Sequence, residues 1–171
     1  GADKVSLNTA AINRPELISE AARRFGSSTI VVSVEAIKKP DGGYEAYTDN
    51  GRESTGVDAI QWAIRAAELG AGEIMVTSID REGTGKGFDL ELTREIAQSV
   101  SIPVIACGGA GNVGHVSEVV TDGKADAVSM ASILHYECAS RLVADDADYD
   151  GEGNVEFLSG GRGFSLVEGT D

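Results

Sequence analysis

The sequence has few cysteine, proline and basic residues, and these shortages exclude several classes of protein. Its 171 residues include 2 Cys and 3 Pro, so a disulfide framework or a zinc site built on paired cysteines is not expected. Only 14 residues are Lys or Arg, against 28 that are Asp or Glu, and the formal net charge is −14. A chain with this net negative charge repels the phosphate backbone of nucleic acids and the surface of anionic lipids. We therefore expect neither a nucleic acid nor a membrane partner, and any anion must be bound locally by backbone N–H groups.

Long apolar runs and a leader are also missing. No run approaches the roughly 20 apolar residues that cross a bilayer, and the N-terminus has no basic stretch followed by an apolar one. The two cysteines, Cys107 and Cys138, have no paired spacing and are predicted to be free thiols in a reducing compartment. These features predict a cytoplasmic protein. The chain has no initiator Met and begins almost directly on a strand-like run, so we expect that the start of a larger protein is missing.

A regular alternation of apolar runs with segments of helical periodicity fills the rest of the chain. The expected strands are 4–8, 29–35, 73–80, 102–107 and 125–132, and the expected helices are 14–26, 57–70, 89–100 and 113–123. Such alternation is typical of a parallel sheet covered by helices, in one domain at this length. An open doubly wound sheet and a closed (βα)₈ barrel both fit the pattern.

Polar or small residues follow every expected strand, which favours a barrel with its site on the loops at the C-terminal ends of the strands. The segment "GGAGN" (Gly108–Asn112) follows one strand and precedes a helix, and Ala131 and Ser132 follow the next strand. In barrels of this kind, a phosphate site often forms from a glycine turn and a helix N-terminus after the last strands. The alternative is a plain glycine turn.

Five stretches resemble, in order and spacing, the C-terminal two-thirds of the cyclase subunit of imidazole glycerol phosphate synthase. They are "GADKVSLNTAA" (1–11), "GAGEIMVTSIDREGT" (70–84), "GFDLELTREI" (87–96), "IPVIACGGAG" (102–111) and "ASILHYE" (131–137). The resemblance implies an α/β fold in which this chain is a partial (βα)₈ TIM barrel, containing strands four to eight with their helices. Residues 1–171 are then one incomplete barrel domain that lacks the first three βα units, with an irregular C-terminal tail over 138–171.

The resemblance also implies an activity, that of a lyase in histidine biosynthesis. In that family, ammonia from a glutaminase partner passes through the barrel and meets a phosphorylated small-molecule substrate, a bisphosphorylated ribulosyl-formimino carboxamide nucleotide. Cyclisation and cleavage then yield imidazole glycerol phosphate and aminoimidazole carboxamide ribotide. The chemistry moves protons, and carboxyl groups at a barrel mouth can carry them. No cofactor and no metal ion is expected.

Site residues follow from the same resemblance. Glu35 and Glu82 are the catalytic candidates, and Lys4 and Glu73, which begin strands, match a ring of charges at the ammonia entrance. The other matched positions are expected to bind the substrate and its phosphates, with the expected hairpin 44–56 folded over the site: Asn8, Thr9, Asn50, Gly83, Thr84, Gly108, Gly109, Ala131 and Ser132.

Both catalytic candidates depart from the family, which usually has Asp at these positions. An extra methylene moves a carboxylate by roughly 1.5 Å, and misplacement of about 1 Å can cost roughly 10²-fold in rate. Three readings therefore stay open. In the first, the chain is the cyclase. In the second, it is an ammonia-delivering paralogue for sugar amidation in surface-polysaccharide synthesis, because "YTDNGRE" (47–53) resembles such proteins. In the third, it is a phosphate-binding half barrel without catalysis. In each reading, two open sheet edges predict a homo-oligomer.

A few other residues are given structural roles. Cys107 is expected to be a buried thiol and His115 a solvated helix residue, whereas His135 is either structural or a support for the site. Residues 146–157 begin like a calcium loop, but the twelfth position is Phe157 where a bidentate Glu is required, so the segment is predicted to be an acidic loop.

Overall fold

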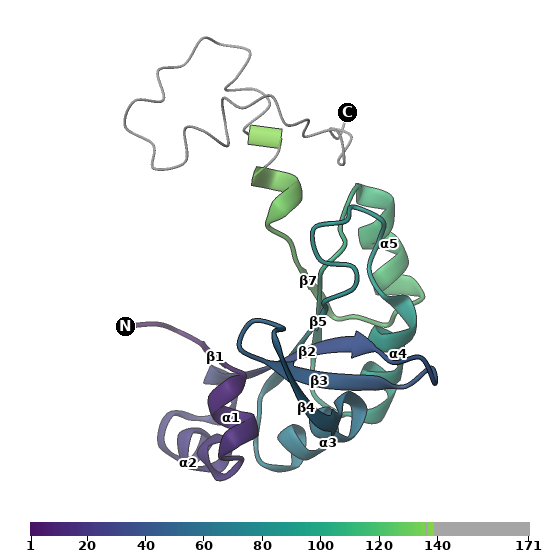
Figure 1. Cartoon of the computed structure of the whole chain (residues 1–171). Coiled ribbons are helices and arrows are strands. Elements are labelled where there is room, and N and C mark those ends of the chain that lie inside the picture. The colour runs from purple at the N-terminus through teal and green to yellow at the C-terminus, as the bar shows by residue number, and fades with distance from the viewer. Residues whose placement is uncertain (136, 139–171) are drawn as a thin grey trace, which may run out of the picture.

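The computed structural model describes residues 1–135, 137 and 138. Strands and helices alternate along the chain, as the sequence pattern predicts (Figure 1). The elements are β1 (Val5–Leu7), α1 (Thr9–Asn13), α2 (Glu16–Phe25), a 3₁₀ turn (Ser27–Thr29), β2 (Ile30–Lys38), β3 (Tyr44–Thr48), β4 (Glu53–Asp58), α3 (Ala59–Glu68), β5 (Glu73–Ser78), α4 (Leu90–Ser99), β6 (Val104–Cys107), α5 (Val113–Thr121) and β7 (Ala127–Ser129). The calcium-like segment 146–157 and all of the predicted tail except Cys138 lie outside the described residues.

One mostly parallel sheet organises the fold. Strands β1, β2, β5, β6 and β7 are parallel neighbours in that order, and β3 and β4 form an antiparallel hairpin on the C-terminal part of β2. Helices α3, α4 and α5 pack in succession against one another on one side of this sheet (Figure 1). The predicted α/β class is confirmed, and the arrangement is consistent with part of a TIM barrel.

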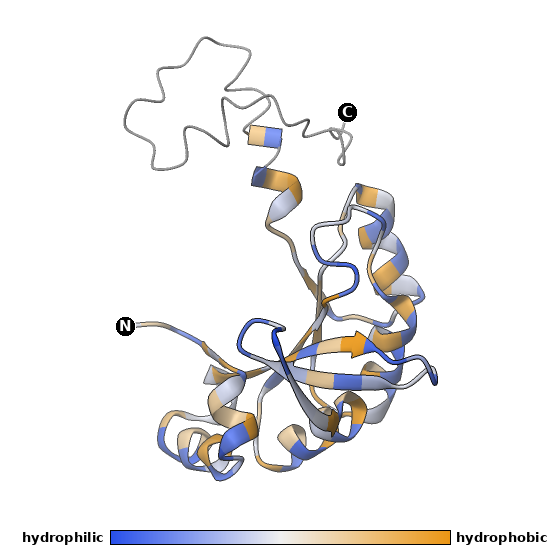
Figure 2. Ribbon diagram, viewed as in Figure 1, coloured by the Kyte–Doolittle hydropathy of each residue, from blue (hydrophilic) through white to orange (hydrophobic). Residues whose placement is uncertain are grey.

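The core lies between the sheet and the helices. Alternate strand residues such as Val32, Ile74 and Val104 are fully buried there against helix residues such as Leu92. Trp62 of α3 is 5% exposed and packs in the same cluster. Figure 2 shows the helices coloured in both orange and blue, as expected of elements that bury one side. The remaining strand residues project from the opposite, inner face of the sheet.

The strand that carries Glu35 is longer than predicted. The prediction ended this strand at Glu35, but β2 continues to Lys38 because Glu35–Lys38 pairs antiparallel with Tyr44–Tyr47 of β3. Glu35 therefore lies inside a paired strand rather than at its end. The short helix α1 was not predicted either. Among the described residues, no helix combines the length and the apolar character that crossing a bilayer requires.

The hairpin is tied to the rest of the fold through Tyr44. The Tyr44 hydroxyl donates to the Asp89 carboxylate, 3.1 Å from Oδ1, and the same oxygen accepts from the backbone N–H of Leu92 as the N-cap of α4. Burial, together with the Asp89 charge, raises the pKa of Tyr44, so the hydroxyl keeps its proton and remains a donor. One end of the hairpin is thereby fixed to the start of α4.

Candidate functional site

The inner face of the sheet presents a row of polar side chains. Glu35 on β2 is in register with Thr77 on β5, Thr77 with Cys107 on β6, and Cys107 with Ser129 on β7. Residues in register on adjacent parallel strands point to the same face, so these four side chains lie side by side. The row stands near the C-terminal ends of the strands, where barrel enzymes place their chemistry.

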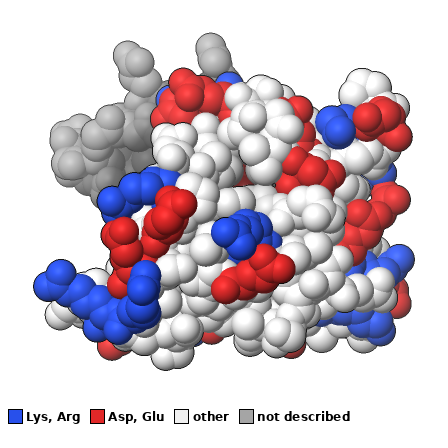
Figure 3. Space-filling model, turned by 90° about the horizontal axis from the view of Figure 1, so that it is seen from below, with Lys and Arg blue, Asp and Glu red and all other residues white. Residues whose placement is uncertain are grey.

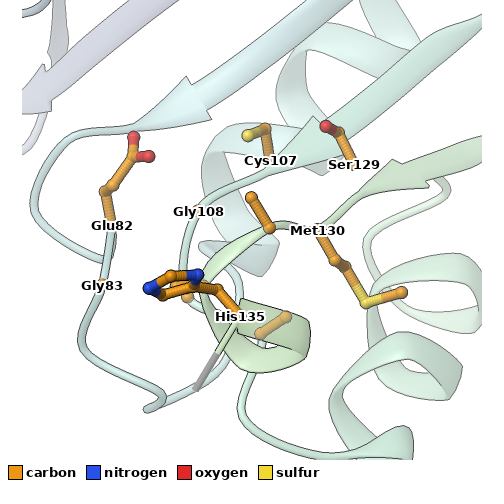
Figure 4. Close-up of a pocket in the computed structure, with 11 residues that line it drawn as sticks. Glu82, Gly83, Cys107, Gly108, Ser129, Met130 and His135 are labelled. Carbon is orange, nitrogen blue, oxygen red and sulfur yellow. The ribbon is translucent and has the colours of Figure 1, made fainter. Parts of the chain in front are cut away.

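Two adjoining cavities open on this row. The inner cavity has a volume of about 500 Å³ and is lined by Glu35 and Thr77, among others. The mouth cavity, of about 310 Å³, lies between the loops that follow β5, β6 and β7 (Figure 4). Glu82 and Cys107 line both cavities. A ligand longer than either cavity can therefore occupy both while passing these two side chains.

Glu35 is placed to meet a ligand. Its side chain is half-buried, and within the described part of the chain its buried Oε2 atom has no hydrogen-bond partner. Buried carboxylate oxygens are nearly always satisfied in native proteins, so an unsatisfied one facing a cavity indicates a group that awaits a donor. Glu82, by contrast, is exposed, and Figure 4 shows it on a separate loop from the strand residues.

Small residues and backbone form the mouth cavity. Gly108 and Gly109 have φ values of +88° and +104°, a region that other residues rarely adopt. They lead into α5, and Gly83, Ala131 and Ser132 complete the lining from the neighbouring loops. Such a surface offers backbone N–H groups near a helix start, which bind anions without a basic side chain.

The turn between β3 and β4 covers the inner cavity. Asp49 and Asn50 have φ values of +51° and +56°, and Asn50 lines the cavity. The Asp49 backbone N–H donates to Thr9 Oγ1 at 3.1 Å, and Asn8 Nδ2 donates to the Tyr47 carbonyl at 3.3 Å. Asn8 and Thr9 thus hold this turn over the end of β1. Non-glycine residues in this backbone region often mark functional sites.

The structure brings together most, but not all, of the predicted site residues. Glu35, Asn50 and Glu82 line the inner cavity, while Gly83, Gly108, Gly109, Ala131 and Ser132 line the mouth cavity. Thr84 lines neither cavity, and its hydroxyl donates to the Arg81 carbonyl at 2.7 Å within its own turn. Lys4 and Glu73 form an ion pair at the N-terminal ends of β1 and β5, the two strands that flank β2 there.

Some site residues were missed or misjudged from the sequence. Thr77 and Ser129 were not predicted, although strict alternation along their strands would have placed them in the same row as Glu35 once the register was known. Cys107 is half-buried, not buried as predicted, because it faces the cavities. His135 lines the mouth cavity (Figure 4), which is consistent with a supporting role.

The described residues provide no cluster of metal-binding side chains. The face of the molecule that Figure 3 shows has no continuous basic surface among those residues. No group of three or more His, Cys, Asp or Glu side chains in this part of the chain could hold a metal ion. In Figure 3, Lys and Arg side chains lie close to Asp and Glu side chains. The described residues that line the mouth cavity include no Lys or Arg, so anion binding there depends on local backbone donors, as the net charge of −14 predicts.

Comparisons with known proteins point to one family. A family model described as "Histidine biosynthesis protein" matches residues 1–140. The chain is 56% identical over 138 residues to the imidazole glycerol phosphate synthase subunit HisF of Lachnoclostridium phytofermentans. The match covers 80% of this chain and 54% of that relative, so the chain spans about half the length of the curated relative that it matches.

Proposed function

Because the chain belongs to the histidine biosynthesis protein family, we propose that it forms the C-terminal part of a cyclase subunit of imidazole glycerol phosphate synthase. Its substrates are then ammonia and the bisphosphorylated ribulosyl-formimino carboxamide nucleotide. The observation that supports this most directly is the pair of adjoining cavities, one with a carboxylate and one lined by glycine loops. A long substrate with a phosphate at each end needs such a loop site for one phosphate beside the carboxylate that acts on its centre.

Each cavity has its own part in the proposed reaction. The loops of Gly108, Gly109, Ala131 and Ser132 hold one substrate phosphate through backbone N–H groups. Glu35 moves a proton as ammonia adds, water leaves and a C–N bond breaks, and its unpartnered Oε2 receives a donor only when substrate is bound. Glu82, at the junction of the cavities, is the second proton carrier.

Ammonia reaches this site from the opposite end of the sheet. We assign the entrance to the ion pair between Lys4 and Glu73, beside which a glutaminase partner docks. From there the inner face leads past the lower row, which contains Ser33 and Met75 in register, to Glu35 and Thr77 above it. The 56% identity to a HisF subunit favours this reading over sugar amidation and over a half barrel without catalysis.

The phosphate site is tested by titrating the isotope-labelled chain with inorganic phosphate while amide chemical shifts are recorded. We expect saturable shifts at Gly108, Gly109, Ala131 and Ser132, and none from sodium chloride at equal ionic strength. Replacing Ser132 with Asp places a like charge in the cavity, so binding should weaken at least about tenfold. Ser117→Asp, on the exposed side of α5, is the matched control and should change little. Shifts confined to other residues would mean that the site is misplaced.

The isolated chain is also proposed to associate with a second copy through its sheet edges. Within the described residues, β1 pairs only with β2, β4 only with β3 and β7 only with β6, so these three strands each have an unpaired edge. Apolar surface accompanies the first edge, where Val5 is 45% and Phe25 62% exposed beside a groove of about 360 Å³. Unpaired edges with apolar neighbours favour pairing with another chain.

Light scattering at several dilutions tests this association. We expect a homodimer or larger assembly of the 171-residue chain. Val5→Lys places a charge on the edge strand and should shift the population toward monomer, because lysine on an edge opposes pairing. Val120→Lys on α5 is the matched control, since Val120 is also 45% exposed. A stable monomer of the unmodified chain would contradict the proposal.

A further inference from the structure

His115 holds the glycine loop that follows β6. It stands in the first turn of α5, and its Nδ1 accepts a hydrogen bond from the backbone N–H of Gly111, with 3.1 Å between the nitrogens. Its own backbone N–H donates to Oδ1 of Asn112, the N-cap of the helix. The sequence prediction of a solvated side chain is therefore wrong, because His115 is half-buried and turned back onto the loop.

The same imidazole ring covers part of the loop that follows β5. A Cβ built on Gly87 would lie 3.6 Å from Cγ and Cδ2 of His115, so the ring lies against the Gly87 backbone. Gly87 also donates its N–H to the Gly109 carbonyl at 2.7 Å. His115 thus hydrogen-bonds one loop and stands next to the other at the place where they meet.

The two loops meet backbone to backbone. A Cβ on Gly109 would lie 2.2 Å from the Gly87 carbonyl oxygen, and one on Gly111 would lie 2.1 Å from that of Gly85. Glycine makes this approach possible but leaves the chain with the greatest freedom of any residue, so the approach needs other groups to hold it. Gly111 is buried, and its N–H would lose its partner if the imidazole were absent.

We propose that His115 is a positioning residue that latches the loop 108–112 to the loop 79–89. It keeps the backbone of Gly108 and Gly109 and the carboxylate of Glu82 in fixed relation around the mouth cavity, although it lines neither cavity itself. The inference rests on the proposed function insofar as it takes this cavity to be the phosphate site. The latch itself is a property of the two loops and is measurable without phosphate.

Two substitutions separate the hydrogen bond from the ring contact. His115→Asn keeps an acceptor, because Asn Oδ1 stands two bonds from Cβ as Nδ1 does, but it removes the ring from Gly87. His115→Phe keeps the ring and removes the acceptor. We expect the Gly111 amide to exchange with solvent faster by about tenfold or more in the Phe variant, because its buried N–H is left unsatisfied. The Gly87 amide should follow, because its bond to the Gly109 carbonyl loosens when the loop of Gly111 moves. Both amides should stay near the original rate in the Asn variant. Unchanged exchange of the Val76 and Ala106 amides, in the strands, reports that each variant is folded.

A direct signature and a titration complete the test. In the unmodified chain, a scalar coupling across the hydrogen bond between the Gly111 amide nitrogen and His115 Nδ1 is expected. Inorganic phosphate should bind about three- to tenfold more weakly to His115→Phe, the size of one lost hydrogen bond, and almost normally to His115→Asn.

The outcomes judge the latch and the phosphate site separately. Equal amide exchange in the Phe variant and the unmodified chain overturns the latch, as does equal phosphate affinity when the unmodified chain binds phosphate. If the unmodified chain does not bind phosphate at these loops, the proposed phosphate site fails, and the exchange rates of Gly87 and Gly111 still decide whether His115 holds the loops together.

Discussion

In a complete barrel, with the missing βα units supplied, Glu35→Gln is expected to lower kcat by about 10²- to 10⁴-fold, the usual contribution of a positioned proton carrier. Gln has almost the same size and can still hydrogen-bond, but it cannot take up and return a proton. Substrate affinity should therefore be nearly retained, and KM should change little. Steady-state turnover with ammonia as the nitrogen donor measures this directly and does not depend on a glutaminase partner.

Glu68→Gln on the outer surface of α3 is the matched control and should leave turnover unchanged. Unchanged turnover in Glu35→Gln would remove Glu35 from the mechanism. A large rise in KM with normal kcat would assign Glu35 to substrate binding instead. The latter outcome is a real alternative, because the unpartnered Oε2 is as well placed to accept a substrate hydrogen bond as to accept a proton.

The fold was predictable because its signals are local. Apolar strands alternate with helices whose ends have ordinary markers: Pro15 precedes α2, Gly26 with a φ of +91° ends it, and Asp89 caps α4. Each marker acts within one turn of helix, so it can be read without knowing the tertiary structure. The C-terminal end of β2 was misplaced because its last residues are held by β3, a partner that local composition does not reveal.

Part of the lining of the two cavities was predictable, but the arrangement of these residues was not. Glu35 was identified by resemblance and the glycine loop 108–112 by its place between a strand and a helix, whereas the row that contains Glu35, Thr77 and Cys107 depends on strand register. His115 was misjudged for a similar reason. A histidine near a helix start looks solvated in the sequence, and only the close approach of Gly87 and Gly111 gives it partners.

The close approach of the two loops predicts that Gly111→Ala will be severely destabilising. Gly111 does not lie in the left-handed region, so alanine is not excluded by its backbone conformation. The added Cβ would nevertheless lie 2.1 Å from the Gly85 carbonyl oxygen and 2.8 Å from the Gly85 carbonyl carbon. Backbone atoms cannot rotate away as the end of a side chain can, so the two loops must separate.

We expect Gly111→Ala to lower the free energy of unfolding by about 2–4 kcal/mol, the range of overpacking and lost backbone hydrogen bonds combined. Urea unfolding followed by the fluorescence of Trp62, the single tryptophan, measures it at a fixed protein concentration. Gly43→Ala is the matched control, because its Cβ would meet only the flexible ends of Lys39 and Asp41. That control should stay within about 0.5 kcal/mol of the unmodified chain.

Phosphate binding distinguishes a local separation of the loops from general loss of stability. Under conditions where Gly111→Ala is still folded, its affinity for inorganic phosphate should fall by at least about tenfold, because Gly108 and Gly109 move with the loop. If Gly111→Ala is as stable as Gly43→Ala and binds phosphate normally, the backbone contact between the loops does not exist in solution. The latch assigned to His115 would then have nothing to hold, because the position of its ring beside Gly87 depends on that contact, whereas its hydrogen bond to Gly111 lies within a single loop.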